Sequence, residues 1–360
     1  MQKVEGSSPF IRFTKARASG PSSLPGTGER RASRSLGRMI IDVDDRQASA
    51  ILGAMHAVGV AHHGELTDAD RRTIESAAQI VLGRPEMRAE EAPPAAPSEL
   101  AATVLSPDEA TQAVRMLAVM SLVDGVIDRE KTDLVMDYAG ELGVDEDFVD
   151  ILAEAAADEI AAAAACMIRR NVESFPHLDI TGIDADAVAP FLPYRDGRAD
   201  PDLEARYREL DTMPEGTFGR AFADHFHRNG FAYPGNPNGL AEGFTTPHDS
   251  SHVLSGYSTS QEGELCVSTF IGAMHPDHPM SAEVLPVLFS WHLGIKLNDI
   301  AQSSTGAFEP VRFWTAWERG AAMRVDVVQE DWDFWGATTA GLDELRTAYG
   351  VEEADPALLP

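Results

Sequence analysis

Hydrophobic residues recur at helical spacing through most of this chain. Between residues 106 and 122 the apolar positions are Val114, Leu117, Ala118, Met120 and Leu122. This segment opens with Ser-Pro-Asp-Glu, which offers a serine N-cap, a proline at the first helical position and acidic residues in the first turn. No stretch of strand length alternates apolar and polar residues. The sequence therefore predicts an all-α fold.

The first predicted domain, residues 39–172, consists of two helical hairpins. One covers residues 46–82 and the other residues 106–142, and each has a glycine in its turn. A segment rich in Pro, Ala and Glu, residues 86–97, separates them and is typical of a linker.

A second helical domain is predicted over residues 203–351, followed by a tail at 352–360. Residues 173–202 contain Pro190, Pro193, Gly197 and Pro201, which is typical of a connection between domains. Helices are expected at 203–211, 218–229, 248–256, 262–274, 281–300, 308–329 and 342–350. The one at 248–256 should begin with Thr246 as N-cap and Pro247 at N1. We expect this domain to fold without the first.

The charge of the chain is strongly negative and unevenly distributed. The net charge is −29, but residues 1–38 hold eight Lys or Arg and two Asp or Glu, so the rest carries −35. Such an acidic body repels nucleic acid and anionic lipid headgroups. Residues 1–38 lack periodicity, so we expect a disordered, dispensable tail, with Met39 as an alternative start. No run approaches the roughly 18 apolar residues of a membrane span.

The strongest chemical signal is the sequence His-Asp-Ser-Ser-His at 248–252, followed by Glu264. Histidines four residues apart lie on one helix face, so His248 and His252 can reach one ion. Glu264 opens the next helix and points back if the two helices are antiparallel. Asp249 is either a further ligand or a residue that orients an imidazole. Two imidazoles with one or two carboxylates predict a Zn²⁺ site, with another divalent metal as the alternative.

Two other enzyme classes use related motifs. A metalloprotease would need Glu in place of Asp249 to act as the base. Phosphohydrolases also contain a His-Asp pair, but they need further ligands from other helices. In this chain the available histidines are His225, His227, His275, His278 and His292.

The two N-terminal hairpins share a short echo, HGELTDADR in the first and DGVIDREKT in the second. The second copy, with Ser121, Asp124, Gly125 and Glu130, resembles the TerB tellurite-resistance family of helical domains, which usually has Ala at the position of Ser121. The residues are compatible with a weak cation site of carboxylates. We favour the interpretation in which Asp124 and Asp128 cap helices and the glycine has positive φ.

Eleven residues separate His252 from Glu264, and the stretch LDTMPEGTFGRAF occupies residues 210–222. Together with WERGAAM at 317–323, DWDFW at 331–335 and LDELR at 342–346, these features resemble the coenzyme Q biosynthesis protein four family, which has an HDxxH-x11-E zinc motif. The resemblance spans roughly residues 200–350. Ser250 and Ser251 stand where that family usually has a bulky residue, and the N-terminal helices are not part of its usual architecture.

This second resemblance implies a zinc-dependent protein that acts on, or presents, a prenylated aromatic ring, with oxidative decarboxylation at C1 as the expected reaction. It further implies an isoprenoid lipid or prenylated quinone precursor as ligand, with quinone-biosynthesis enzymes as partners, a homodimer and a position at the membrane periphery as further expectations. The two cysteines, Cys166 and Cys266, lie in apolar helical contexts and indicate reduced thiols in a cytoplasmic protein. The alternatives are a non-catalytic isoprenoid-binding scaffold and a TerB-like metal-stress protein. A closed four-ligand site favours the scaffold, whereas an open position facing an apolar pocket favours chemistry. The aromatic residues expected mainly in the core, with some in a prenyl groove, are Phe289, Trp291, Phe313, Trp314 and Trp317.

Overall fold

The computed structural model describes residues 41–180, 183, 188–194, 197–297 and 302–360. The predicted tail at residues 1–38 lies outside the described residues. In the described part there is no β-sheet, and the only strand-like pairings are two isolated bridges, Thr217 with Gly341 and Leu293 with Thr305. The prediction of an all-α fold is therefore confirmed.

The helices follow one another through both halves of the chain. The α-helices are α1 (Asp45–Val60), α2 (Asp68–Ser76), α3 (Pro97–Ala101), α4 (Pro107–Met120), α5 (Arg129–Leu142), α6 (Asp147–Ala156), α7 (Ile160–Ser174), α8 (Pro201–Arg208), α9 (Phe218–Asn229), α10 (Glu242–Ser255), α11 (Gln261–Met274), α12 (Leu285–Val287), α13 (Pro310–Ala321), α14 (Phe334–Ala337) and α15 (Leu342–Tyr349). Three π-helical segments are η1 (Ala77–Val81), η6 (Pro279–Val284) and η7 (Leu288–His292). Short 3₁₀ turns are η2 (Ala89–Glu91), η3 (Ala189–Phe191), η5 (Glu209–Thr212) and η8 (Pro356–Leu358).

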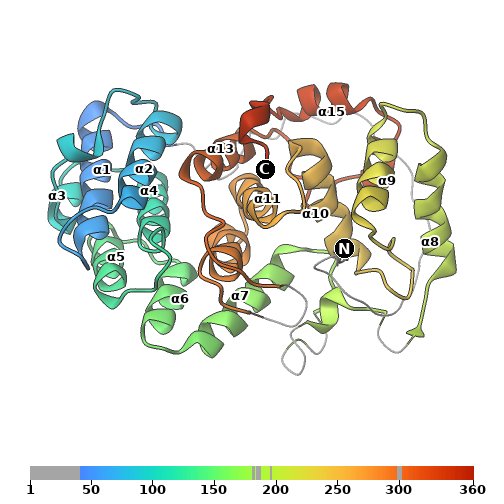
Figure 1. Cartoon of the computed structure of the whole chain (residues 1–360), viewed down its shortest axis with the longest axis horizontal. Coiled ribbons are helices and arrows are strands. Elements are labelled where there is room, and N and C mark those ends of the chain that lie inside the picture. The colour runs from blue at the N-terminus through green and yellow to red at the C-terminus, as the bar shows by residue number, and fades with distance from the viewer. Residues whose placement is uncertain (1–40, 181–182, 184–187, 195–196, 298–301) are drawn as a thin grey trace, which may run out of the picture.

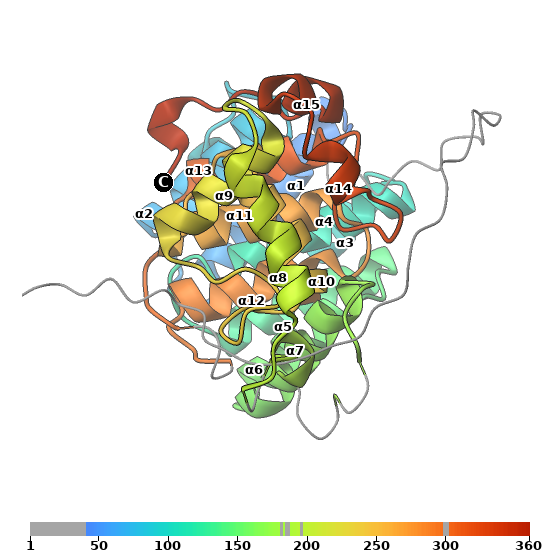
Figure 2. The same cartoon turned by 90° about the vertical axis from the view of Figure 1, so that its right-hand side faces the viewer.

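We call α1 to α7 the first half of the chain and α8 to α15 the second half. Helices α11 and α13 belong to the second half but lie close to the first. Figure 1 shows α1 to α5 on one side of this pair and α8, α9 and α10 on the other. Figure 2, viewed from that second side, shows α8 and α9 in front of α11. Helix α13 packs against α11 and also against α2 and η1, which belong to the first half.

The hydrophobic cores do not follow the predicted domain boundary. One core joins residues of α1 to α7 with Leu265 of α11, Leu285 of α12 and Trp314 of α13. The second core contains α9 and α10 together with Cys266 and Phe270, which lie on another face of α11. Since α11 and α13 contribute to both cores, the two halves bury apolar surface jointly. Residues 203–351 alone would therefore expose part of this apolar surface, and their independent folding stays a prediction.

Side-chain N-caps account for where α2, α4 and α5 begin. Ser106 accepts a hydrogen bond from the Glu109 amide, and Glu109 accepts one from the Ser106 amide, so the predicted cap is confirmed as a capping box. In the two echoed turns, Thr67 and Asp128 each follow a positive-φ glycine by three residues and cap the next helix. The echo therefore corresponds to equivalent turn geometry in both hairpins.

Helix α10 begins earlier than predicted. It starts at Glu242, and Pro247 lies inside it rather than at N1. The Thr246 hydroxyl is in hydrogen-bond contact with the Tyr207 hydroxyl and so does not cap the helix. Pro247 has no N–H to donate to the Gly243 carbonyl, and α10 nevertheless continues to Ser255.

The helix expected at 281–300 is irregular where it is described. Residues 279–292 form η6, α12 and η7 in succession, with Pro286 in the middle. Proline cannot donate the helical hydrogen bond, and the wider π turns accommodate it. Residues 298–300 of this prediction lie outside the described part. The helix predicted at 308–329 ends at Ala321, whereas α9 has the predicted bounds.

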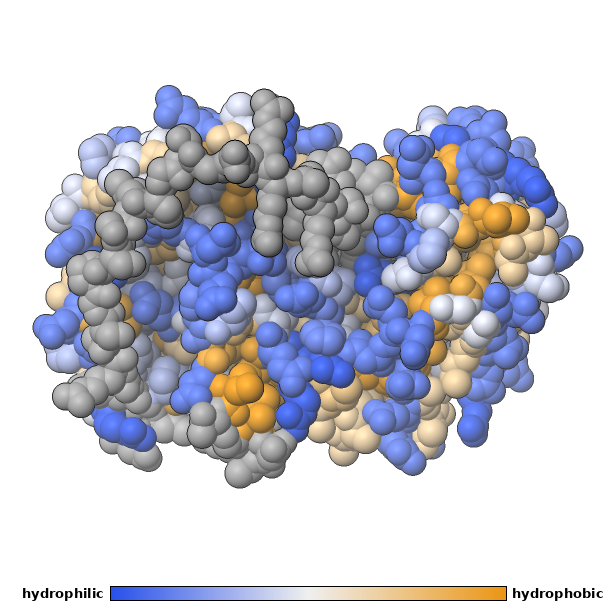
Figure 3. Space-filling view, turned by 180° about the vertical axis from the view of Figure 1, so that it is seen from behind, coloured by the Kyte–Doolittle hydropathy of each residue, from blue (hydrophilic) through white to orange (hydrophobic). Residues whose placement is uncertain are grey.

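The described surface is largely hydrophilic on the face drawn in Figure 3, where hydrophobic residues gather only in limited areas. Within the described residues, no helix is long and apolar enough to cross a bilayer.

Candidate metal centre

Two buried helices supply the candidate ligands. His248 and His252 lie one turn apart on α10, and Glu264 lies in the first turn of α11. The exposed fractions of these three residues are 6%, 2% and 4%. Because α10 and α11 pack against each other, the carboxylate of Glu264 returns toward both imidazoles, as the sequence predicted.

The spacing of the donor atoms fits a shared ion. His248 Nε2 lies 3.5 Å from Glu264 Oε2, and His252 Nε2 lies 3.6 Å from Glu264 Oε1. All three residues offer a ligand atom within 4.8 Å of the others. Two atoms that each lie about 2.0–2.1 Å from a tetrahedral zinc ion are about 3.3 Å apart. The distances are therefore long for direct hydrogen bonds but close to those between ligands of one metal.

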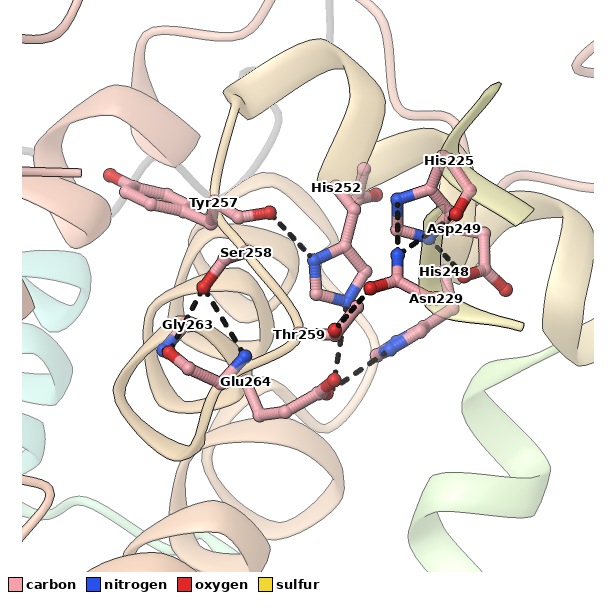
Figure 4. Close-up of polar contacts among 12 residues, drawn as sticks. His225, Asn229, His248, Asp249, His252, Tyr257, Ser258, Thr259, Gly263 and Glu264 are labelled. Carbon is pink, nitrogen blue, oxygen red and sulfur yellow. Dashed lines mark hydrogen bonds and ion pairs between the residues drawn. The ribbon is translucent and has the colours of Figure 1, made fainter. Parts of the chain in front are cut away.

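The imidazole orientations agree with this arrangement. His252 Nδ1 lies 2.9 Å from the carbonyl oxygen of Tyr257, so this nitrogen carries the proton and Nε2 faces Glu264 (Figure 4). His248 Nε2 is buried and has no hydrogen-bond partner in the described part of the chain. A buried polar atom without a partner is costly, and a bound cation would supply one.

The two neighbouring histidines favour the ionised form of Glu264, which is the form that binds a metal ion. Burial opposes its ionisation, but the neighbouring imidazoles of His252 and His248 outweigh that effect and lower the pKa of this carboxyl well below its usual range. Burial also opposes the charged form of His252, yet the Glu264 carboxylate raises the pKa of this imidazole. A metal ion would take the place of the imidazolium proton beside this carboxylate.

Asp249 lies outside this group of three. Its Oδ1 is 2.7 Å from Nε2 of His225 on α9, and the His225 ring stacks on that of His252 with centroids 5.3 Å apart. In Figure 4 this pair lies beside His252, away from Glu264. The carboxylate thus orients an imidazole that contacts a candidate ligand, and it is not placed as a fourth ligand.

An apolar cavity of about 110 Å³ adjoins the three residues. His248 and Glu264 line it, and the Phe244 ring stacks on His248 at 4.9 Å. Much of the remaining lining comes from α7, η6, α12 and η7, including Met167, Ile168, Pro286, Val287 and Trp291. Of the five aromatic residues predicted mainly as core, all are buried, and Trp291 lines this cavity. The side of the centre next to His248 and Glu264 therefore faces an apolar pocket.

The carboxylates of the two echoed turns share a buried lysine as their positively charged partner. Lys131 is fully buried, with its Nζ 2.7 Å from Asp124 Oδ2 and 3.8 Å from Asp70 Oδ1. Asp70 and Lys131 follow Gly64 and Gly125 by six residues each, so they occupy equivalent places in the two echoed turns. Asp124 is thus an ion-pair partner and not a helix cap, whereas Asp128 does cap α5.

A second group that could hold a metal is His62, Asp128 and Glu130. His62 and Glu130 are exposed, and His62 Nδ1 pairs with Asp128 at 2.8 Å. Such surface groups are common without an ion, and nothing else in the described structure points to one here.

The other histidines do not converge on the centre. His227 contacts Asp211, His275 contacts Asp326 and His278 contacts Asp147, while His292 lies 3.2 Å from the carbonyl oxygen of Val123. The additional ligand set that a phosphohydrolase needs is therefore not assembled by these residues.

Sequence reasoning missed two contributors to the site. His225 was only one of several spare histidines, and nothing in its spacing indicated the contact with Asp249. Glu283 lines the cavity and is 3% exposed. The sequence does contain an indication of its importance, since Glu283 is the single charged residue in the apolar stretch 279–291.

No model of a known protein family matches this chain, and a search of curated proteins found no significant match.

Proposed function

We propose that this chain binds one Zn²⁺ ion through His248, His252 and Glu264 and uses the adjoining cavity to bind a prenylated aromatic ring. The observation that carries the proposal is His248 Nε2, which is buried without a hydrogen-bond partner and lies 3.5 Å from a carboxylate oxygen. One cation among the three donor atoms would satisfy them together.

The donor set favours zinc over harder cations. Two imidazole nitrogens and one carboxylate are a ligand set that zinc accepts, whereas Ca²⁺ and Mg²⁺ prefer oxygen ligands. Because Asp249 is turned toward His225, the three residues leave a fourth position for water or for a ligand oxygen. When bound, zinc would act as a Lewis acid toward such an oxygen.

The cavity supports an aromatic ligand. An apolar cavity of roughly 150 Å³ can hold benzene, and this one measures about 110 Å³. It therefore has room on the order of one ring, and a prenyl tail would have to continue beyond it. The apolar side chains lining it would exclude water from the ring.

The expected reaction comes from the family resemblance alone. Replacing a ring carboxyl by a hydroxyl breaks the ring–carboxyl bond, takes one oxygen atom from water, and releases CO₂, two protons and two electrons. Zinc undergoes no redox change, so a separate oxidant such as dioxygen would have to accept them. The non-catalytic scaffold is the alternative, and the open fourth position beside an apolar cavity favours chemistry over it. A homodimer, association with quinone-biosynthesis enzymes and a position at the membrane periphery belong to the same proposal.

The proposal is tested by the metal content of the full chain. We expect about one zinc per chain by elemental analysis, and His252→Ala should abolish most of it, because one imidazole and one carboxylate form a much weaker zinc site. His227→Ala is the matched control, since this histidine of α9 is exposed and pairs with Asp211 away from the centre.

Native mass spectrometry of the same preparations should detect co-purified isoprenoid in the wild type. The proposed function fails if the wild type holds no stoichiometric zinc and added zinc leaves its melting temperature unchanged. Equal loss of zinc in the His227 control would show that the effect of His252→Ala is not specific to the site.

A further inference from the structure

Glu283 is a second polar group in the cavity, separate from the candidate metal ligands. It lies on η6, is 3% exposed, and lines the same cavity as His248 and Glu264. Among the described residues, no Lys, Arg or His forms an ion pair with it. Burial of a carboxyl without a positive partner favours the neutral, protonated acid.

The hydrogen bonds of Glu283 fix which of its oxygens accepts. Asn171 Nδ2 donates to the carbonyl oxygen of Ala282 at 2.8 Å and to Glu283 Oε1 at 3.1 Å. The first contact requires a donor, so it settles the orientation of the amide. Ser174 Oγ lies 3.4 Å from the same Oε1. Because Oε1 accepts from Asn171, the proton of the neutral acid belongs on Oε2.

The charged groups on neighbouring elements are engaged elsewhere. Arg170 of α7 pairs with Asp147 of α6 and with Glu173, and His278 also pairs with Asp147. The charged residue that shares the cavity is Glu264 of α11. Burial raises the pKa of Glu283 to about 8, against the hydrogen bonds from Ser174 and Asn171, which favour its ionised form.

Helix α11 sets the distance between the two ends of the cavity. Glu264, Ser268 and Gly272 lie on one face at four-residue intervals, and the first two line the cavity. A Cβ atom at Gly272 would lie 3.1 Å from the Glu283 Cβ, so Glu283 sits beside the position of Gly272. Eight residues of helix span about 12 Å. The side chains of Glu264 and Glu283 therefore enter the cavity from places about two turns apart.

We propose that Glu283 is a specificity-determining residue, which donates a hydrogen bond from Oε2 to an oxygen on the part of the ligand remote from the metal centre. This inference rests on the proposed function, because it assumes that the ligand's other end binds at the metal. It names the ligand class more narrowly: a ring with a metal-binding oxygen group at one end and a hydrogen-bond acceptor opposite.

A matched pair of probes tests this assignment in the zinc-loaded full chain. The probes are 4-methoxybenzoate, which carries an acceptor oxygen opposite its carboxylate, and 4-ethylbenzoate, which has a similar size without it. Wild-type protein should bind the methoxy compound about fivefold more tightly by calorimetry at pH 6.5, which corresponds to about 1 kcal/mol for one hydrogen bond.

Two variants separate hydrogen bonding from shape. Glu283→Gln should keep the preference, because its amide can accept from Asn171 and donate toward the ligand. Glu283→Met should bind both probes equally, with zinc content and near-ultraviolet circular dichroism as checks on the fold. Above about pH 8 the preference should fade in the wild type, since the ionised acid cannot donate, and should persist in Glu283→Gln.

The outcomes separate the role of Glu283 from the metal and cavity proposal. Equal binding of both probes by the wild type, or an unchanged preference in Glu283→Met, overturns the role of Glu283 and leaves the metal and cavity proposal standing. Failure of the zinc-loaded wild type to bind either probe overturns both.

Discussion

The replacement Trp314→Ala tests whether the two halves of the chain form one cooperative unit. Trp314 lies on α13, is fully buried, and has ring contacts with Phe313 and Trp317 at 4.9 and 5.3 Å. Its Nε1–H donates to the carbonyl oxygen of Thr73 in α2, at 3.2 Å. The side chain therefore belongs to the core that joins α13 to the first half.

The expected cost of this change is large. Truncating a buried Trp to Ala costs about 3–5 kcal/mol, which is a substantial part of the 5–15 kcal/mol that stabilises a typical protein. Trp314→Phe is the matched control, because it keeps most of the apolar volume and loses chiefly the hydrogen bond to Thr73, at about 1–2 kcal/mol.

Urea denaturation should be followed by two signals, the far-ultraviolet circular dichroism of the whole chain and the hydrogen-exchange protection of α2. Both should shift to lower urea together in Trp314→Ala, and less in Trp314→Phe. A fragment of residues 203–351 should likewise fail to fold cooperatively, because it would expose the face of α13 that carries Trp314. The shared-core reasoning is refuted if the fragment folds with a sharp transition, or if protection in α2 is unaffected by Trp314→Ala.

Three further outcomes are expected. Lys131→Met should destabilise the protein by about 3–5 kcal/mol in chemical denaturation, because it leaves Asp70 and Asp124 buried without a cation; a loss below 1 kcal/mol would contradict this account. Asp249→Asn should weaken zinc binding by about 10–100-fold in a chelator competition, less than His252→Ala, since Asp249 acts through His225; complete loss of zinc would indicate a direct ligand. The pKa of Glu283 is raised to about 8 in the folded protein, so the unfolded chain loses this proton at lower pH than the folded one. The free energy of unfolding should therefore be highest below about pH 4.5 and should fall by up to about 1.4 kcal/mol per pH unit toward pH 8. Glu283→Gln should flatten that decline in denaturation curves measured across this range, and a parallel curve would show that Glu283 does not titrate there.

Local sequence determined much of what was predicted correctly. The cap at Ser106, the bounds of α9 and the placement of His248 and His252 on one helix face follow from residues within a few positions of one another. Capping and helical periodicity are short-range effects, so one sequence is enough to read them. The return of Glu264 toward the histidines also followed, because only a short turn joins α10 to α11.

Long-range packing decided the rest. The direction of Asp249 depends on α9, which presents His225 from 24 residues away. The cavity wall depends on α7, whose Asn171 reaches Glu283 across 112 residues. The shared core depends on α13 meeting α2, a contact that no local pattern encodes. In each case the contacting helix is determined by which apolar faces are buried together, and these contacts form only when the whole chain packs.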